Sequence, residues 1–327
     1  MITTIAALAL STTQTAALVQ RRGDVPNLRG IAVCPGAGST FFVASEDNVV
    51  WHVDAVTRKR VRSFTGHPQA VYGLTTNAAG TILATGDDSG RIWLWDVKTG
   101  KKMREFPRNA TTHQRGIQAL SFAADGKTLA STGKDDQVIV WDVASAKPIK
   151  NLVSGGANVS SAVVTPGGMW AVTLGSGLWY YKANALTAKI PAHGSQGAMD
   201  FRADLKGTRG ISGGRDGSVM IWNLTTRKSM SSRLAHEDSV ISVAMAPNGR
   251  IAASSCSVDR TVKIWDVSTG VMVSKFDDQS AVGAPLCFTM DGKFFVSANA
   301  ADAPLVYSVT PPVGVAPVKA PVKKKRR

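Results

Sequence analysis

Histidine, serine and aspartate recur together in this chain at repeated spacings, a combination that can support nucleophilic catalysis. Three sets share one pattern, in which the serine lies ten residues and the aspartate six residues before a tryptophan. In a serine hydrolase, a histidine takes the proton of the serine hydroxyl while an aspartate orients the imidazole ring. The three sets are His113, Ser131, Asp135 and Trp141; His193, Ser212, Asp216 and Trp222; and His236, Ser255, Asp259 and Trp265. A fourth set is close to this pattern: His67, Thr85, Asp88 and Trp95.

The repetition itself argues against catalysis, because an active site needs only one such set. The sequence also lacks a G-x-S-x-G nucleophile turn and gives no sign of an oxyanion hole. Tryptophan only donates a hydrogen bond, aspartate only accepts, and serine and neutral histidine do both. A chain of bonds from tryptophan through serine and histidine to aspartate is therefore satisfied throughout. We expect a structural network in each unit, and we predict that the protein is not an enzyme.

Repeated units of about 43 residues must position these side chains. Aromatic anchors lie at positions 51, 95, 141, 181, 222, 265 and 307, spaced 40 to 46 residues apart. Four of the five histidines precede an anchor by 28 or 29 residues. Between the anchors, short runs of alternating hydrophobicity are separated by Gly-containing turns, which predicts β-strands. Four short strands in about 43 residues is the size of one propeller blade.

The units resemble the WD40-repeat family. The Trp-Asp pair is literal at Trp95-Asp96, Trp141-Asp142 and Trp265-Asp266, and Gly66-His67 supplies the Gly-His pair. The resemblance covers residues 14 to 309 and implies an all-β, seven-bladed β-propeller with four antiparallel strands per blade. It also implies that an N-terminal strand joins the last blade and closes the ring. We expect a short extension at residues 1–13, the propeller at 14–310 and a disordered basic tail at 311–327.

Composition narrows the function classes further. The chain has 327 residues, a formal net charge of +15 and three cysteines without a Cys-x-x-Cys pair, which argues against a disulfide scaffold and a zinc site. No phosphate loop, dinucleotide fingerprint or metal-ligand spacing is present, so we predict no cofactor and no metal. No apolar run is long enough to cross a membrane, and we expect no integral membrane association.

Loops on a rigid ring are where binding residues are expected. The resemblance implies that partners bind the face formed by the loops that carry the histidines and turn aspartates. By their phase in the repeat, the candidate partner-binding residues are Arg29, Tyr72, Arg115, Gln118, Lys134 and Arg215. Arginine and lysine there favour an acidic or phosphorylated peptide. The opposing interpretation is that charged turn residues are simply solvated.

We therefore predict a scaffold for protein–protein interaction, a monomeric propeller within a larger complex. The alternative is an electrostatic nucleic-acid binder that acts through its basic body and tail, since Lys319 and the run from Lys323 to Arg327 make the tail strongly basic. We expect a cytoplasmic protein, and in a eukaryotic host the tail would suit a nuclear address. Export is the alternative suggested by the N-terminal stretch MITTIAALALSTTQTAAL with its small apolar core, although positive residues before that core are lacking.

Overall fold

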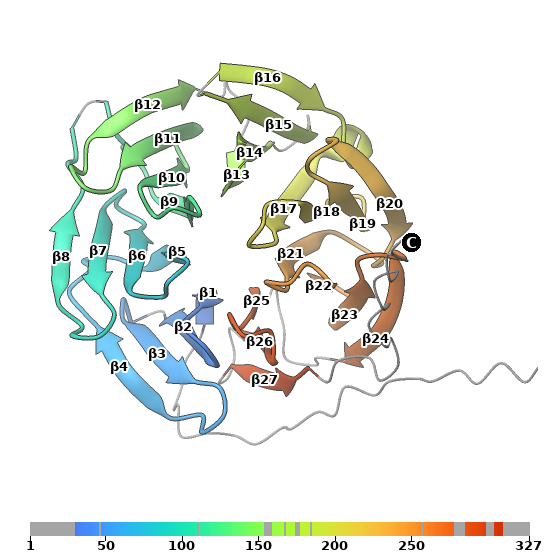
Figure 1. Ribbon diagram of the computed structural model, residues 1–327, viewed down its shortest axis with the longest axis horizontal. Helices are drawn as coiled ribbons and strands as arrows, with labels where there is room; N and C mark the ends of the chain where they lie inside the picture. The colour runs from blue at the N-terminus through green and yellow to red at the C-terminus, as the bar shows by residue number, and fades with distance from the viewer. Residues whose placement is uncertain are drawn as a thin grey trace, which may run out of the picture.

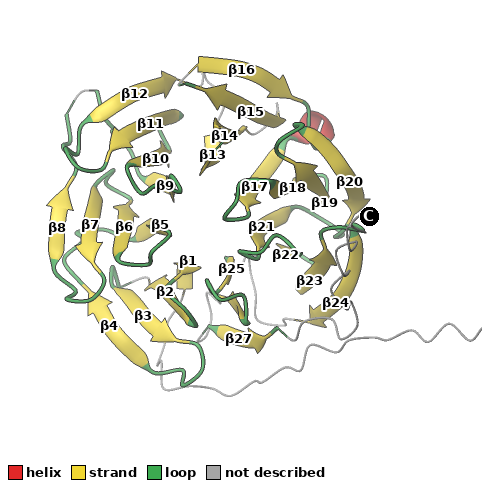
Figure 2. Ribbon diagram, viewed as in Figure 1, coloured by secondary structure: helices red, strands yellow, loops and turns green. Residues whose placement is uncertain are grey.

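Seven β-sheets form a ring around a central channel (Figure 1). The computed structural model describes residues 30–309 except 46, 110, 154–158, 167, 174–176, 184, 257, 278–284 and 299–303. Within these residues the only helix is the single turn η1, Gly194–Gln196 (Figure 2). The prediction of an all-β, seven-bladed propeller is confirmed. No helix in this part of the chain combines the length and hydropathy needed to cross a membrane.

Each blade is an antiparallel meander that runs from the channel outward. The strands of blades 1, 2 and 3 are β1 (Gly30–Pro35), β2 (Thr40–Ser45), β3 (Val50–Asp54) and β4 (Arg60–Phe64); β5 (Val71–Thr76), β6 (Ile82–Asp87), β7 (Ile92–Asp96) and β8 (Lys102–Glu105); and β9 (Ile117–Phe122), β10 (Thr128–Gly133), β11 (Gln137–Asp142) and β12 (Pro148–Val153).

Blades 4, 5 and 6 repeat this order, and blade 7 has three strands among the described residues. Their strands are β13 (Val159–Thr165), β14 (Gly168–Thr173), β15 (Gly177–Lys182) and β16 (Ala185–Ile190); β17 (Ala198–Ala203), β18 (Arg209–Gly214), β19 (Ser218–Asn223) and β20 (Lys228–Leu234); β21 (Val240–Met245), β22 (Ile251–Cys256), β23 (Thr261–Asp266) and β24 (Val271–Asp277); and β25 (Leu286–Phe288), β26 (Phe294–Ser297) and β27 (Leu305–Ser308).

Burial explains why the middle strands are apolar on both faces. Each sheet is covered on both sides by its neighbours, so five of the six residues of β6 and of β10 are buried. The outermost strands face solvent, and all four residues of β8 are exposed. One apolar cluster fills each of the seven interfaces between adjacent blades. Removal of this apolar surface from water is the main force that holds the ring together.

Blades 1 and 7 pack against each other in the same way as the other pairs. Phe41, Val43 and Val53 of blade 1 share a cluster with Val296 and Val306 of blade 7. The ring is therefore closed by apolar packing between its first and last blades. The predicted closing strand, the extension at 1–13 and the tail at 311–327 lie outside the described residues.

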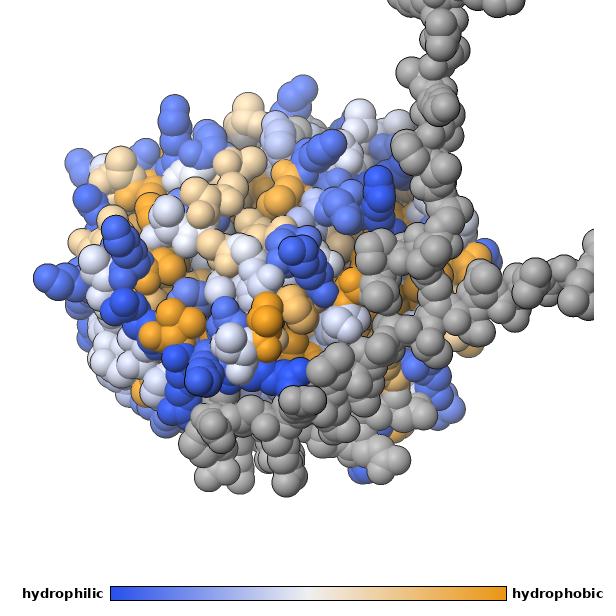
Figure 3. Space-filling view, turned by 60° about the horizontal axis from the view of Figure 1, so that its bottom comes forward, coloured by the Kyte–Doolittle hydropathy of each residue, from blue (hydrophilic) through white to orange (hydrophobic). Residues whose placement is uncertain are grey.

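The meander gives the propeller two faces with different loops. The connections between blades and the turns from the second to the third strand lie on one face, called here the His/Asp face because they carry the histidines and turn aspartates. The turns from the first to the second and from the third to the fourth strand lie on the opposite face, called here the tight-turn face. In the view of Figure 3, hydrophilic side chains stand out from the surface and apolar ones lie between them.

Candidate functional site

The predicted chain of hydrogen bonds is present in blade 3. Trp141 Nε1 donates to Ser131 Oγ over 2.7 Å, and Ser131 Oγ lies 2.7 Å from His113 Nε2. His113 Nδ1 lies 2.9 Å from Asp135 Oδ1. A neutral histidine protonated on Nδ1 donates to the carboxylate and accepts from the serine. The structure thus links the connection before the blade to its second strand, its third strand and the turn between them.

Blade 5 contains the same chain. Trp222 Nε1 lies 2.8 Å from Ser212 Oγ, which lies 2.7 Å from His193 Nε2. His193 Nδ1 lies 3.2 Å from Asp216 and 2.8 Å from the hydroxyl of Ser218. The serine two residues after the aspartate therefore supports the histidine as well.

In blade 6 the predicted serine was wrong. Trp265 Nε1 donates to Ser254 Oγ over 2.9 Å, and His236 Nε2 lies 2.8 Å from the same oxygen. The histidine bonds Asp259 as predicted, over 2.8 Å. Ser255 is buried elsewhere in the sheet.

Strand register explains this error. In blade 6, Trp265 pairs with Ala252, and the hydroxyl residue stands two positions further along the strand. In blade 3, Trp141 pairs with Leu129, and Ser131 stands at the same offset of two. Side chains two apart share a face of a strand, so register decides which serine meets the tryptophan. Ser254 lies eleven residues before Trp265, whereas Ser131 lies ten residues before Trp141. Counting back ten residues from Trp265 therefore reaches Ser255, which lies on the opposite face of the strand.

In blade 2 the predicted aspartate was wrong. His67 Nε2 and Trp95 Nε1 meet Thr85 Oγ1 at 2.6 and 2.8 Å, but His67 Nδ1 lies 2.9 Å from Asp87 Oδ2. Asp87 ends β6 and is fully buried, and its other oxygen accepts from the turn. Asp88 follows the strand and instead binds the ammonium of Lys134 in the next blade.

Burial and hydrogen bonding set the charge states of these groups. Burial alone would raise the pKa of Asp135, but the hydrogen bond from His113 and the backbone N–H of Gln114 outweigh it and lower the pKa. Burial lowers the pKa of His193 and of His236 below the ordinary value, although Asp216 and Asp259 oppose this. A carboxylate and a neutral imidazole are the forms that the chain of bonds requires.

The same burial excludes a substrate from the hydroxyl groups. Thr85, Ser131, Ser212 and Ser254 have no solvent-exposed surface, so nothing can approach the oxygen that would act as a nucleophile. The arrangement links the strands and connections of blades 2, 3, 5 and 6, and its buried hydroxyls are closed to a substrate.

A cluster in blade 6 has a composition that could bind a metal ion. Within the described residues, His236, Cys256 and Asp259 place ligand atoms within 4.8 Å of one another. Both ring nitrogens of His236 already have partners, and Lys263 Nζ lies 3.6 Å from Asp259. An ammonium group beside the carboxylate repels a cation, and we therefore assign the cluster to the structural chain.

A ring of β-bulges surrounds the channel on the His/Asp face. The second residue of the first strand is skipped by the ladder in blades 1 to 6. A bulge turns a side chain away from the direction that regular pairing would impose. From blade 2 to blade 6 these residues line the channel. The bulge ring consists of Ile31, Tyr72, Gln118, Ser160, Met199 and Ile241.

The structure places five of the six candidate binding residues on this face. Tyr72 and Gln118 belong to the bulge ring, and Arg115 lies two residues before the start of β9. Lys134 binds Asp88 and lies 5.0 Å above the Tyr72 ring. Arg215 Nε lies 3.3 Å from Met199 Sδ. Arg29 lies outside the described residues.

Among the bulge residues that line the channel, sequence reasoning missed Met199, Ser160 and Ile241. Tyr72 and Gln118 each precede their anchors by 23 residues, and Met199 precedes Trp222 by the same number. This offset would have found Met199. The same offset does not find the other two, because Ser160 precedes Tyr181 by 21 residues and Ile241 precedes Trp265 by 24 residues.

The loops of the His/Asp face carry slightly more acid than base. Counting only described residues between strands, eight are acidic and six basic. The acidic residues are Asp47, Asp88, Asp135, Asp136, Asp216, Glu237, Asp238 and Asp259, and the basic ones are Arg91, Arg108, Arg115, Lys134, Arg215 and Arg260. Since Lys134 is paired with Asp88, Arg115 and Arg215 are the positive groups that remain near the bulge ring.

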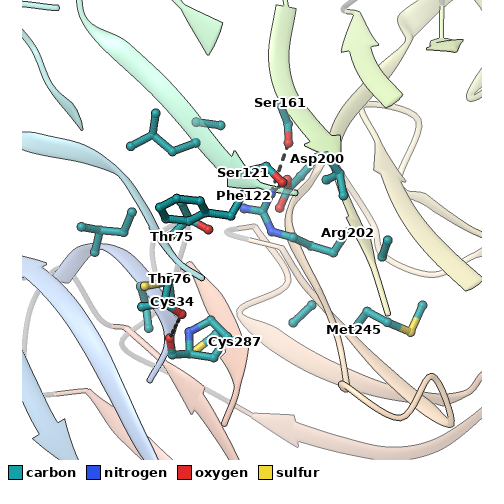
Figure 4. Close-up of a pocket in the computed structure, with 18 of the residues that line it drawn as sticks. Cys34, Thr75, Thr76, Ser121, Phe122, Ser161, Asp200, Arg202, Met245 and Cys287 are labelled. Carbon is teal, nitrogen blue, oxygen red and sulfur yellow. Dashed lines mark hydrogen bonds and ion pairs between the residues drawn. The ribbon is translucent and has the colours of Figure 1, made fainter. Parts of the chain in front are cut away.

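The channel holds a cavity of about 540 Å³ lined by the first strands of the blades. Figure 4 shows the Arg202 side chain extending into it, where Nη1 lies 3.1 Å from Asp200 Oδ1 and 3.2 Å from Ser161 Oγ. Asp200 also accepts from the backbone N–H of Val243 in blade 6. The Arg202 guanidinium is therefore neutralised and shared between blades, and this pair has a structural role.

All three cysteines are free and buried. Burial raises the pKa of Cys287, and burial together with the neighbouring Cys287 raises the pKa of Cys34. The thiols of Cys34 and Cys287 are therefore kept protonated and unreactive at neutral pH.

The repeats of this chain are similar to repeats in known proteins. The family described as "WD domain, G-beta repeat" matches residues 58–96, 102–142 and 227–266. The small ribosomal subunit protein RACK1y of Oryza sativa subsp. japonica is 38% identical over 79 residues, which are 24% of this chain and 23% of that protein. Nuclear distribution protein nudF 1 of Talaromyces marneffei is 31% identical over 117 residues, or 35% of this chain and 25% of that protein.

A longer match extends over most of the ring. Eukaryotic translation initiation factor 3 subunit I of Anopheles gambiae is 22% identical over 249 residues, which are 76% of this chain and 66% of that protein. The two matches of higher identity span only about a quarter of those relatives' lengths.

Proposed function

Because this chain belongs to the WD40-repeat family, we propose that it is a non-enzymatic scaffold that holds a protein partner on its His/Asp face. Three repeats match the family, and seven blades complete the ring. The buried hydroxyls support a structural role for the Ser–His–Asp sets. Binding then depends on the side chains that stand outside the ladders.

The bulge ring is the main observation that supports this proposal. Its residues take no part in strand pairing, and five of them line the channel on one face. Tyr72 is 38% exposed, a high value for a large aromatic residue beside a rigid channel. Met199 and Ile241 are half-buried and add apolar surface. Exposed aromatic and apolar groups on a rigid frame are typical of binding hot spots.

The charge of the face defines the partner more closely. The eight acidic loop residues of this face would repel an extended acidic segment. We therefore narrow the predicted acidic partner to a peptide with a single acidic or phosphorylated residue. Arg115 or Arg215 would bind that residue, since arginine binds carboxylate and phosphate through paired hydrogen bonds. An apolar residue beside it would contact Tyr72 and Met199.

The relatives support a role within an assembly. One is named as a small ribosomal subunit protein and another as a subunit of a translation initiation factor. A rigid propeller that presents one face suits a subunit of a larger complex.

Selection from a displayed library of random 12-residue peptides tests the proposal. The wild-type protein is expected to enrich peptides that combine apolar residues with one acidic residue. The variant Tyr72→Ala/Arg115→Ala/Arg215→Ala should bind the enriched peptides at least about tenfold more weakly, because anchor residues carry most of the binding energy.

A matched control carries three substitutions on the tight-turn face, Lys127→Ala, Lys182→Ala and Lys293→Ala, all at exposed positions. This control should bind like the wild type. Equal affinity of the triple His/Asp-face variant and the wild type would refute the proposal.

A further inference from the structure

The two faces of the propeller differ sharply in charge. Between the strands on the tight-turn face, the described residues include ten basic and three acidic side chains. The basic ones are Arg58, Lys59, Lys98, Lys101, Lys127, Lys147, Lys206, Arg227, Arg250 and Lys293, and the acidic ones are Asp125, Asp204 and Asp291. The opposite face, with its excess of acid, does not share this character. The positive charge of the propeller is therefore concentrated on one side.

The charge is densest where blades 1 and 2 meet. Their two third-to-fourth-strand turns and the strands β4 and β8 contain eight basic residues, called here the blade 1–2 cluster. One acidic residue, Glu105, lies in the same segments, and Asp54 and Asp96 end the strands that precede the two turns. The cluster consists of Arg58, Lys59, Arg60, Arg62, Lys98, Lys101, Lys102 and Arg104.

The acidic residues are committed to local partners. Asp54 Oδ1 accepts from the backbone N–H and the hydroxyl of Thr57 at 2.7 and 3.0 Å. Asp96 Oδ1 accepts the same pair of bonds from Thr99 at 2.6 and 2.7 Å. Glu105 bonds Arg91 and Lys102. Each carboxylate therefore completes its own turn or strand pair, and the lysines of the turns keep their charge toward solvent.

The two halves of the cluster are continuous. Arg62 Nη1, on blade 1, donates to the carbonyl oxygen of Thr99 in the turn of blade 2 over 2.9 Å. Gly100 allows this crossing, because a Cβ there would lie 2.7 Å from Arg62 Cδ. Arg60 lies 3.9 Å from the centre of the Trp51 ring, which fixes its guanidinium on the outer wall.

Three lysines of the cluster are available for a ligand. Lys59, Lys98 and Lys101 are exposed and form no side-chain ion pair with any described residue. They lie on the two adjacent tight turns, while β4 and β8 continue the positive charge along the outer wall (Figure 1). The cluster thus bends from the flat face onto the side of the ring.

We propose that the blade 1–2 cluster binds the phosphate backbone of single-stranded nucleic acid. Regularly spaced phosphates complement a continuous row of lysine and arginine side chains. A flexible strand can follow the bend between the face and the wall, whereas a flat bilayer meets one of the two surfaces. Among the described residues, the aromatic rings beside the cluster, Trp51 and Trp93, are covered by Arg60 and Lys102, so we expect binding that is independent of base sequence. This surface lies opposite the partner-binding face and does not depend on it.

Binding of mixed-sequence 20-nucleotide RNA and DNA, measured by fluorescence anisotropy from about 50 to 200 mM salt, tests the proposal. The variant Lys59→Glu/Lys98→Glu/Lys101→Glu should bind at least about tenfold more weakly at the lowest salt. The slope of log affinity against log salt should fall by about 2, since each lost phosphate contact removes about 0.7 from it. Its melting temperature should stay unchanged, because the three side chains are exposed.

The control Lys127→Glu/Lys182→Glu/Lys293→Glu makes the same change in net charge at exposed positions outside the cluster. It should retain most of the affinity and of the slope. All three proteins keep the basic residues beyond position 310, so any binding by the tail is common to them. Equal losses in the two variants would show that net charge alone acts, and would overturn the proposal.

Vesicles provide the second arm, because exposed Val61 and Met103 lie between basic residues of the cluster and would also suit a lipid surface. Sedimentation with phosphatidylcholine vesicles containing about 30% phosphatidylserine should not depend on the three lysines. If the cluster variant loses vesicle binding but keeps nucleic-acid binding, the cluster is a membrane contact and the proposal is wrong.

Discussion

Blades 1 and 2 have the same four-stranded arrangement, but a chain of polar hydrogen bonds links the strands in blade 2 and apolar packing replaces it in blade 1. In blade 2, Trp95 donates to Thr85, which bonds His67. In blade 1, strand register puts Val53 where Trp95 stands, since each precedes the aspartate that ends its third strand. Val43 occupies the place of Thr85, two positions beyond the residue that pairs with Val53.

This comparison corrects the predicted anchor at Trp51. Trp51 corresponds to Trp93 and lies under the guanidinium of Arg60, much as Trp93 lies under the ammonium of Lys102. Val43 and Val53 are both buried. Blade 1 has thus lost the indole donor and the hydroxyl acceptor together. Replacing both partners by apolar groups can be nearly neutral, whereas losing one leaves the other unpaired.

The largest effect is expected when one member of an intact chain is removed. Ser131→Ala leaves Trp141 Nε1 and His113 Nε2 buried without a partner. At about 1–3 kcal/mol for each such group, the free energy of unfolding should fall by about 3 kcal/mol. Chemical denaturation measures this loss. The same substitution at the exposed turn residue Ser145 should cost less than about 1 kcal/mol, and equal losses at the two sites would contradict the comparison.

The converse change in blade 1 should cost somewhat less. Val43→Thr puts a hydroxyl group into an apolar cluster in which Val53 occupies the place of the tryptophan donor of blade 2. We expect a loss of about 2 kcal/mol in the free energy of unfolding from burying the unpaired group. A neutral outcome would mean that blade 1 still accommodates a polar chain, and the division between the two kinds of blade would then fail.

The smallest effect concerns a histidine without the polar chain. His52 in blade 1 stacks on Phe42 with ring centres 4.4 Å apart, and neither ring nitrogen has a hydrogen-bond partner among the described residues. Burial, reinforced by nearby Arg62, lowers its pKa to about 4. In the unfolded chain the pKa is about 6.5, so the unfolded state binds the proton first as pH falls.

The stability due to neutral His52 is therefore fully present above about pH 6.5 and is lost as the pH falls toward about 4. His52→Phe keeps the stacking but cannot be protonated. The variant should lose about 1 kcal/mol less stability than the wild type between about pH 7 and 5.5. Denaturation midpoints across this range give the comparison, and parallel curves for the two proteins would rule out His52 as the source.

Sequence periodicity was sufficient for the fold and for most of the polar chains. A hydrophobic and aromatic repeat of about 43 residues determines the blade, and the sets around His113 and His193 follow from fixed offsets. The offsets failed at Ser255, at Asp88 and at Trp51. In each case an inserted turn residue or a shifted register changed which face of a strand a residue occupies, and one position is enough to reverse the face.

The candidate binding site was predictable only in part, for a related reason. Tyr72 and Gln118 follow from the phase of the repeat, but that these residues stand outside the ladder depends on bulges, which pairing defines. The contrast in charge between the two faces was also hidden. Loops of the two faces alternate along the chain, and only the meander sorts the basic and the acidic loops onto opposite sides of the ring.

The bulges have one more consequence. A residue that takes no part in the ladder can be exchanged without disturbing the pairing of its neighbours, so the six positions around the channel can vary at little cost to folding. In the proposed function, recognition and architecture are thereby separated within a single strand. A ring of this kind can acquire a new partner through a few substitutions while its blades stay the same.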